Sequence, residues 1–339
     1  MRVGELMHAL IRNEVLKILL KKKMVLILTL LILFISLFSY GQKYVYEQNL
    51  SRLEASTSSA GYDWKSLAKQ QIGDLERRLN SPYIDEEGIN SINIEIEQLN
   101  YFIENDINPV TPTAARFTVE FIDQAIIMFI PLLIIILAAD IVSGELSNRT
   151  IKVLLTRAIP RWKILFSKLM ALMIMSTLVV LLVAIISTLI SGMFFGRWGF
   201  NEPVTTGFRL VNGSLNSSYV RTVSRVSYMI LVYSLTWFVS VVIASITLMI
   251  SVLVQNTASA IGIVMSTLIG GQFLQFFLSD WVLVKYFFVS NLSLTKYLTG
   301  NYQQIEGMSL IFSVIVLGVW AAVSLAVGFY VFLKKDILV

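Results

Sequence analysis

The sequence holds few residues that could perform catalysis. It has no cysteine and only one histidine, His8, which excludes a thiol nucleophile, a cysteine-ligated metal site and a histidine cluster. The motifs of a phosphate-binding loop (G-x-x-x-x-G-K-[ST]), a zinc protease (H-E-x-x-H) and a serine hydrolase (G-x-S-x-G) do not occur. We therefore expect that this chain is not an enzyme and that it binds no cofactor or metal of its own.

The charged residues most able to form a structural ion pair lie between positions 139 and 168. Asp140 and Glu145 follow a long apolar stretch and precede several lysines and arginines. An ion pair or hydrogen bond made by either acid could lock this part of the chain as an elbow. The simpler alternative, a solvated basic loop, stays open at this point.

A short helix is predicted inside this elbow. Ser147 or Asn148 can cap its start, and Leu154 and Leu155 belong to its apolar face. Pro160 can then open the next helix at its first turn. A push on such a helix would be transmitted to the segments on both sides of it.

The composition indicates that those segments cross a membrane. Of 339 residues, 56% are hydrophobic and only 14% are charged, whereas soluble domains have about 25% charged residues. These values exclude an ordinary soluble domain, a disordered chain and a coiled coil. The net charge of +5 is then better explained by loops that face anionic lipid than by nucleic acid, which we do not expect as a partner.

Runs without acidic or basic residues predict six membrane spans, because a helix needs about 20 apolar residues to cross the hydrocarbon. The expected segments are an amphipathic interfacial helix at 1–23, spans at 24–40, 121–142, 164–196, 226–254, 258–279 and 307–333, an extracellular insert at 41–120, a coupling-helix loop at 143–163, an extracellular loop at 197–225, an extracellular or interfacial segment at 280–306 and a tail at 334–339. The pair Gly270-Gly271 would allow the fifth span to bend or to pack closely.

The distribution of lysine and arginine predicts that both termini are cytoplasmic. The insert at 41–120 has seven basic and 13 acidic residues, in contrast to the basic remainder of the chain. Its apolar residues form stripes over 64–79 and 89–103, which predict a helical hairpin broken at Ser81-Pro82. This hairpin could be a structural cap, a lid or a docking element for a substrate.

The stretch 169–196 and the interiors of spans four to six contain no acidic or basic residue, so these spans do not readily relay protons. Their Ser, Thr and Gln residues could line a pathway, although such groups more often hydrogen-bond between helices. The candidates for lining are Ser234, Thr236, Ser240, Thr267, Gln272 and Gln275. If the protein transports a solute actively, the energy must come mechanically from a partner.

The elbow also resembles a known family. Gly144-Glu145, Thr150, Leu154-Leu155, Arg157, Arg161 and Lys168 are similar to the signature of ABC-2 type permeases, the membrane subunits of ABC exporters. Arg149 stands where that signature usually has Gly, and Ala158 where it usually has Pro. The resemblance implies an all-α integral membrane protein with six transmembrane helices and an extracellular helical hairpin insert, like the multidrug and peptide-antibiotic exporters of type V.

The resemblance further implies how such a protein works. A separate cytoplasmic ABC ATPase would bind ATP and Mg and would contact the elbow, and a second permease subunit would complete the pathway. The residues implied in coupling are Glu145, Arg149, Thr150, Leu154, Leu155, Arg157, Pro160 and Arg161. The expected site is the bacterial cell membrane with its lipids, and the expected cargo is a hydrophobic or amphipathic solute such as a peptide, drug or lipid. The alternative is a membrane sensor or scaffold whose insert binds a ligand.

Overall fold

The computed structural model describes residues 3–56, 64–80, 86–148, 150, 159–207, 209–211, 214–216, 220–277, 281–299 and 307–334. In these residues, six helical stretches are long and apolar enough to cross a membrane. They comprise α2 (Lys23–Ser56), α6 (Phe129–Ala138) with α7 (Asp140–Ser147), α9 (Arg161–Phe195), α10 (Arg225–Leu253), α11 (Thr257–Phe277) and α13 (Leu310–Lys334). The protein is therefore a mostly helical membrane protein with several spans.

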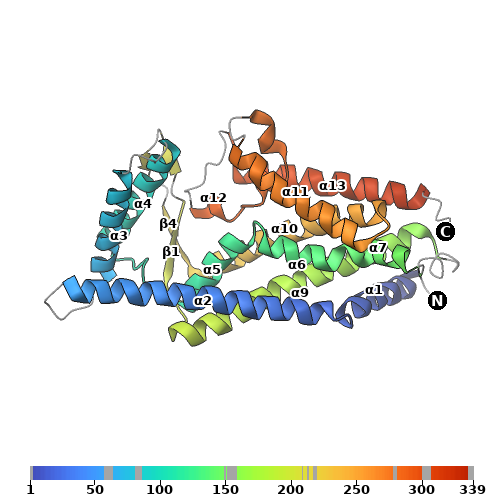
Figure 1. The fold of residues 1–339 in the computed structure, drawn as a ribbon, viewed down its shortest axis with the longest axis horizontal. Coiled ribbons are helices and arrows are strands. Elements are labelled where there is room, and N and C mark those ends of the chain that lie inside the picture. The colour runs from blue at the N-terminus through green and yellow to red at the C-terminus, as the bar shows by residue number, and fades with distance from the viewer. Residues whose placement is uncertain are drawn as a thin grey trace.

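The long helices run roughly along one direction (Figure 1). Helix α1 (Val3–Leu19) and the last turns of α13 lie at one end of the molecule, and α3 (Trp64–Leu79) and α4 (Glu86–Glu104) lie at the other. Helix α10 is central, because it packs on α13, α9, α6, α7 and α11. Many of its residues, such as Val239 and Ile243, are fully buried. This arrangement places the charged elbow and the N-terminal helix at the same end.

The second predicted span, 121–142, is not one continuous helix. Helix α5 (Ala114–Ala125) ends before a turn at 126–128, and α6 and α7 meet at Ala139. There, Ser251 of α10 accepts hydrogen bonds from the backbone N–H groups of Val142 and Ser143, at 3.2 and 2.9 Å. The Ser251 hydroxyl also donates to the carbonyl of Ala139 at 2.7 Å. A side chain from another helix thus satisfies backbone groups at the junction, which the hydropathy pattern does not reveal.

The part of the chain outside the long helices holds two small structures. Helices α3 and α4 pack through Leu75, Ile92 and Leu99. The stretch predicted as a loop at 197–225 contains short antiparallel strand pairs, a small addition to a fold that is otherwise helical, as predicted. The strands are β1 (Pro203–Thr206) with β4 (Arg221–Ser224), and β2 (Arg209–Val211) with β3 (Ser214–Asn216). Their Val and Thr residues favour extended backbone, which accounts for this small sheet structure.

The aromatic segment after α11 folds back onto the helices. It contains η2 (Val282–Tyr286), η3 (Val289–Asn291) and α12 (Lys296–Thr299), and the side chains of Phe288 and Leu292 are buried. Gly271 makes this packing feasible, because a Cβ atom there would lie only 2.6 Å from side-chain atoms of Phe287 and Val289. A Cβ at Gly270 would meet nothing within 4 Å. Only the second glycine of the pair therefore permits the close approach.

Replacing Gly271 by Ala should lower the stability of the protein by about 1–3 kcal/mol, because the added methyl group overpacks the contact with Phe287 and Val289. Gly270→Ala is the matched control, since it adds the same group in open space and should be neutral or slightly stabilising. Unfolding in mixed detergent micelles would measure both. Equal effects of the two substitutions would contradict the assignment of Gly271 to this contact.

Candidate functional site

Four charged side chains form a closed network between α1, α7 and α9. The Lys168 ammonium group lies 3.0 Å from Glu14 Oε2 and 2.8 Å from Glu145 Oε1. Lys17 contacts the same two acids, at 2.9 Å from Glu14 Oε1 and 3.1 Å from Glu145 Oε1. Lys168 has no exposed side-chain surface, and Glu14 is 7% exposed. Two cations and two anions therefore balance each other, with Lys168 and Glu14 buried and Lys17 part-exposed at the edge.

The periodicity of α1 explains how Glu14 reaches this position. Ile18 and Glu14 are both buried and lie four residues apart, on the face of the helix that packs against α9. Lys17, which lies between them, is part-exposed at the edge of this face. Helix α9 begins at Arg161, so Lys168 lies two turns into it. A buried carboxylate on one helix thus faces a buried ammonium group on the other.

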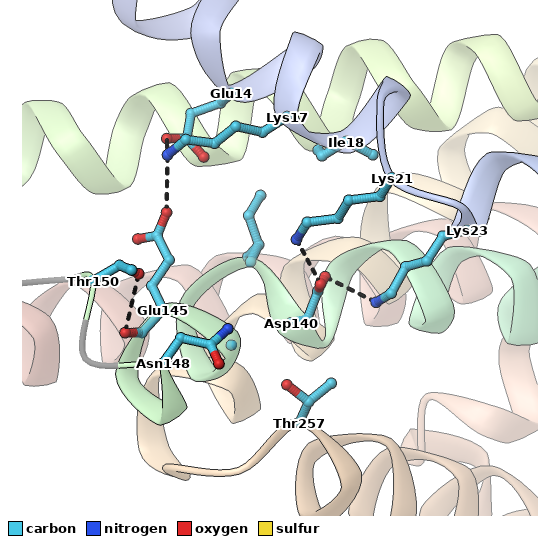
Figure 2. Close-up of a pocket in the computed structure, with 12 residues that line it drawn as sticks. Glu14, Lys17, Ile18, Lys21, Lys23, Asp140, Glu145, Asn148, Thr150 and Thr257 are labelled. Atoms are coloured by element: carbon cyan, nitrogen blue, oxygen red, sulfur yellow. Dashed lines mark hydrogen bonds and ion pairs between the residues drawn. The ribbon is translucent and has the colours of Figure 1, made fainter.

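A second charged contact ties the corner between α1 and α2 to the start of α7. Lys21 and Lys23 both bind Asp140, at 2.7 and 3.0 Å, and Lys23 also donates to the carbonyl of Ile136 at 2.8 Å. Figure 2 shows these side chains pointing from opposite walls into one cavity, together with the contact between Lys17 and Glu145. The cavity has a volume of about 500 Å³. Helix α7 is therefore bound at both of its ends to the N-terminal segment.

The opposite charges around Glu14 and Lys17 keep both of these α1 side chains ionised. Burial acts to raise the pKa of Glu14, but the positive charges of Lys168 and Lys17 outweigh it, so the pKa lies below its ordinary value of 4.5. Burial acts to lower the pKa of Lys17, but its contacts with Glu14 and Glu145 outweigh burial, so its pKa lies above 10.5. Glu14 and Lys17 are therefore both charged at neutral pH.

The structure describes only part of the predicted coupling segment. Arg149, Leu154, Leu155 and Arg157 lie outside the described residues, as does the helix predicted between 149 and 156. Thr150 is described, and its hydroxyl donates to the carbonyl of Glu145 at 3.4 Å.

The two predicted residues that flank the start of α9 have different roles. Pro160 directly precedes the helix and adopts an extended backbone conformation. Arg161 donates to the carbonyl of Leu333 at 3.3 Å and so links the start of α9 to the end of α13. Both stand at the point where the elbow joins the third candidate span.

Both acids of the predicted elbow lock form ion pairs with lysines. Asp140 binds lysines of the α1–α2 corner, and Glu145 binds Lys17 and Lys168. Sequence reasoning missed Glu14 as a member of this network. The available signal was a carboxylate within the stripe of Met7, Ile11 and Ile18 along α1.

The six candidates for pathway lining do not converge in this single chain. Thr236 and Ser240 are buried and donate to backbone carbonyls one turn earlier in α10. Ser234 lies on another face, where it lines an apolar groove between α9 and α10. Thr267 donates within its own helix, α11, which also carries the half-buried Gln272 and Gln275.

The network has the properties of a mechanical link between helices. Within the described residues, no group of three or more acidic or histidine side chains could hold a metal ion. Removing one charge would leave a buried charge uncompensated, so the partners are forced to stay together. The network therefore holds α1, α7 and α9 together.

Lys168→Met should destabilise the protein by about 3–5 kcal/mol, because Glu14 and Glu145 would then share only the ammonium group of Lys17. The control is Lys43→Met, which breaks a pair with Glu47 between exposed side chains at 3.8 Å and should cost less than about 1 kcal/mol. Unfolding in mixed micelles measures both changes. Similar losses for the two variants would argue against a special role of Lys168.

The network should also give the protein a defined pH dependence. Because the folded-state pKa of Glu14 is lowered, its stabilisation is present above 4.5 and is lost as the pH falls through the lowered pKa. Because the pKa of Lys17 is raised, its stabilisation is present below 10.5 and is lost as the pH rises through the raised pKa. Melting temperatures measured across pH should fall less steeply on the acid side for Glu14→Gln than for the wild type. Parallel acid limbs would show that Glu14 does not contribute.

Comparisons with known proteins find relatives in Bacillus subtilis. The chain is 27% identical over 288 residues to the uncharacterized protein YhcI of Bacillus subtilis (strain 168), covering 83% of this chain and 87% of that protein. It is 27% identical over 209 residues to the uncharacterized membrane protein YdbK of the same organism, covering 60% of this chain and 76% of that protein. A family described as "Protein of unknown function (DUF2705)" matches residues 91–338. This range includes five of the six apolar helical stretches, all except α2. Because this match spans most of the chain, the protein belongs to the DUF2705 family.

Proposed function

We propose that this chain is the membrane-spanning subunit of an ABC exporter and that a separate cytoplasmic ATPase drives it. The observation that carries this proposal is the buried network of Glu14, Lys17, Glu145 and Lys168. Glu145 and Lys168 stand near the two ends of the segment that resembles the ABC-2 permease signature, and they form an ion pair at 2.8 Å. A force on the segment between them would therefore be applied to helices that the ion pairs hold together.

The proposed mechanism begins at the elbow. The partner ATPase, which would hold ATP and Mg, would bind the segment 149–156 that follows Glu145. Its motion on closing would displace α7, and the ion pairs would carry α1 and α9 along, because separating them leaves buried charges without partners. The junction at Ala139, where Ser251 of α10 replaces regular helix contacts, would allow α7 to tilt relative to α6.

The remaining features agree with a transport subunit. The start of α1 and the end of α13 lie together, as expected when six spans place both termini on one side (Figure 1). The sequence has no phosphate-binding loop, so energy from ATP must enter through a partner. The expected location is the bacterial cell membrane with cytoplasmic termini, and a second permease subunit would complete the pathway between the two chains.

The proposal predicts the effect of reversing charge in the elbow. Arg157→Glu should abolish most of the stimulation that the permease exerts on its ATPase partner, because the contact surface of the elbow would change sign. Arg78→Glu on the exposed surface of α3 makes the same charge change at the other end of the molecule and should leave this activity unchanged. ATP hydrolysis by complexes reconstituted in lipid vesicles measures both.

Two results would count against the exporter. One is equal ATPase activity in the Arg157→Glu and Arg78→Glu complexes. The other is purification from the native membrane without any associated ATPase, which would favour the sensor or scaffold whose outer insert binds a ligand.

A further inference from the structure

One carboxylate oxygen joins three elements near the end of the molecule that carries α3, α4 and the strands (Figure 1). Glu202 Oε2 accepts hydrogen bonds from the hydroxyl of Thr113 at 3.3 Å and from Arg225 Nη2 at 3.4 Å. The same oxygen lies 3.7 Å from Arg116 Nη2. Thr113 directly precedes α5, Arg116 belongs to the first turn of α5, and Arg225 begins α10. Glu202, in the turn before β1, thus connects the starts of two long helices.

The two arginines are like charges that are largely removed from water. The side chain of Arg225 is 7% exposed and that of Arg116 is 11% exposed. Because both guanidinium groups contact the same oxygen, they lie close to each other and repel. Glu120 adds negative charge near both, but within the described residues it forms no ion pair with either. Glu202 therefore supplies the direct counter-charge that lets the two arginines stay together.

The turn that carries Glu202 covers the start of α5. The backbone N–H groups at 114–115 donate to the carbonyls at 197–198, both at 2.9 Å. A helix start has no partners of its own for these N–H groups, so the turn supplies them. Gly199 has a φ of +71°, which favours glycine, and a Cβ atom there would collide with the side chain of Thr113. The protection of the N–H groups at 114–115 thus depends on the turn staying in place.

The contacts of Glu202 are longer than those of the network at the other end. Its distances to the arginines are 3.4 and 3.7 Å, whereas Lys168 lies 3.0 and 2.8 Å from its two acids. Hydrogen bonds between charged groups are strongest near about 2.7–2.9 Å. The side chain of Glu202 is also 37% exposed, so water can solvate its carboxylate when the contacts break. The Glu202 contacts therefore open at a lower cost than those of Lys168.

We infer that Glu202 is a releasable latch, which holds the turn at 197–202 and the starts of α5 and α10 together. When its carboxylate withdraws, Arg116 and Arg225 repel each other, the two helix starts separate, and the turn lifts from α5. This inference goes beyond the proposed function, because the latch requires neither an ATPase nor a cargo. In an exporter, a motion that parts α5 from α10 would first break these contacts.

The test measures backbone hydrogen exchange by mass spectrometry on the full chain in nanodiscs of zwitterionic phospholipid. Glu202→Gln keeps the shape of the side chain and removes its charge. Exchange at 114–115 and in the segment 197–206 should become roughly tenfold faster, as expected when hydrogen bonds to a charged group are lost and the region opens locally. Exchange in α7, which the other network holds, should not change.

A matched control makes the same chemical change nearby. Glu104→Gln removes the charge of an exposed acid at the end of α4 and should exchange like the wild type. The inference is overturned if Glu202→Gln and Glu104→Gln show the same exchange at 114–115.

A double variant separates a latch between like charges from simple packing. Adding Arg225→Met to Glu202→Gln removes one of the two cations, so exchange at 114–115 should return toward the wild-type rate. If Glu202 only filled space, the second substitution would speed exchange further, and the inference would fail. Where Glu202→Gln alone does not fold, a folded double variant supports the latch, and a double variant that also does not fold overturns it.

Discussion

The structure depends on a lysine side chain that has no contact with water. Moving an ammonium group out of water costs several kcal/mol unless opposite charges replace the solvent. Lys168 meets this condition only because Glu14 and Glu145 approach it at 3.0 and 2.8 Å from two other helices. If either carboxylate moved away, the ammonium group of Lys168 would stay buried with less opposite charge beside it, at a cost in stability. The N-terminal helix and the end of the second apolar stretch are thus fixed relative to the start of α9.

This constraint shapes how the bundle could move. The contacts of Lys21 and Lys23 with Asp140 hold the first turn of α7, while Glu145 holds its last turns. Against this rigid end, the junction at Ala139 depends on hydroxyl hydrogen bonds from Ser251, which are individually weaker than buried ion pairs. Deformation is therefore expected at the junction between α6 and α7 rather than within the charged network.

The opposite end of the molecule is arranged differently. There, Arg116 and Arg225 share Glu202, and Arg116 also donates to the carbonyls of Asn108 and Thr111. These contacts join the loop after α4 to α5 and α10. Glu120 of α5 accepts a hydrogen bond from the side-chain amide of Gln42 in α2 at 2.5 Å. One end of the bundle thus has ion pairs that join three helices, and the other has arginines that join a loop to α5 and α10.

The sequence by itself determined the apolar helices and the helical pair of the insert. Runs such as 226–254 must span hydrocarbon, and stripes at helical spacing must be covered, so composition and period suffice for both. The strands near 203–224 were missed, because four-residue strands leave almost no periodic signal. Only the tertiary structure decided which charges meet. Glu14 and Lys168 are 154 positions apart, and Lys17 and Glu145 are 128 apart. A linear pattern indicates that a residue faces inward, but its partner depends on how two helices pack. For the same reason the sequence could not show that Gly271 contacts Phe287 and Val289, or that Ser251 binds the backbone at Ala139.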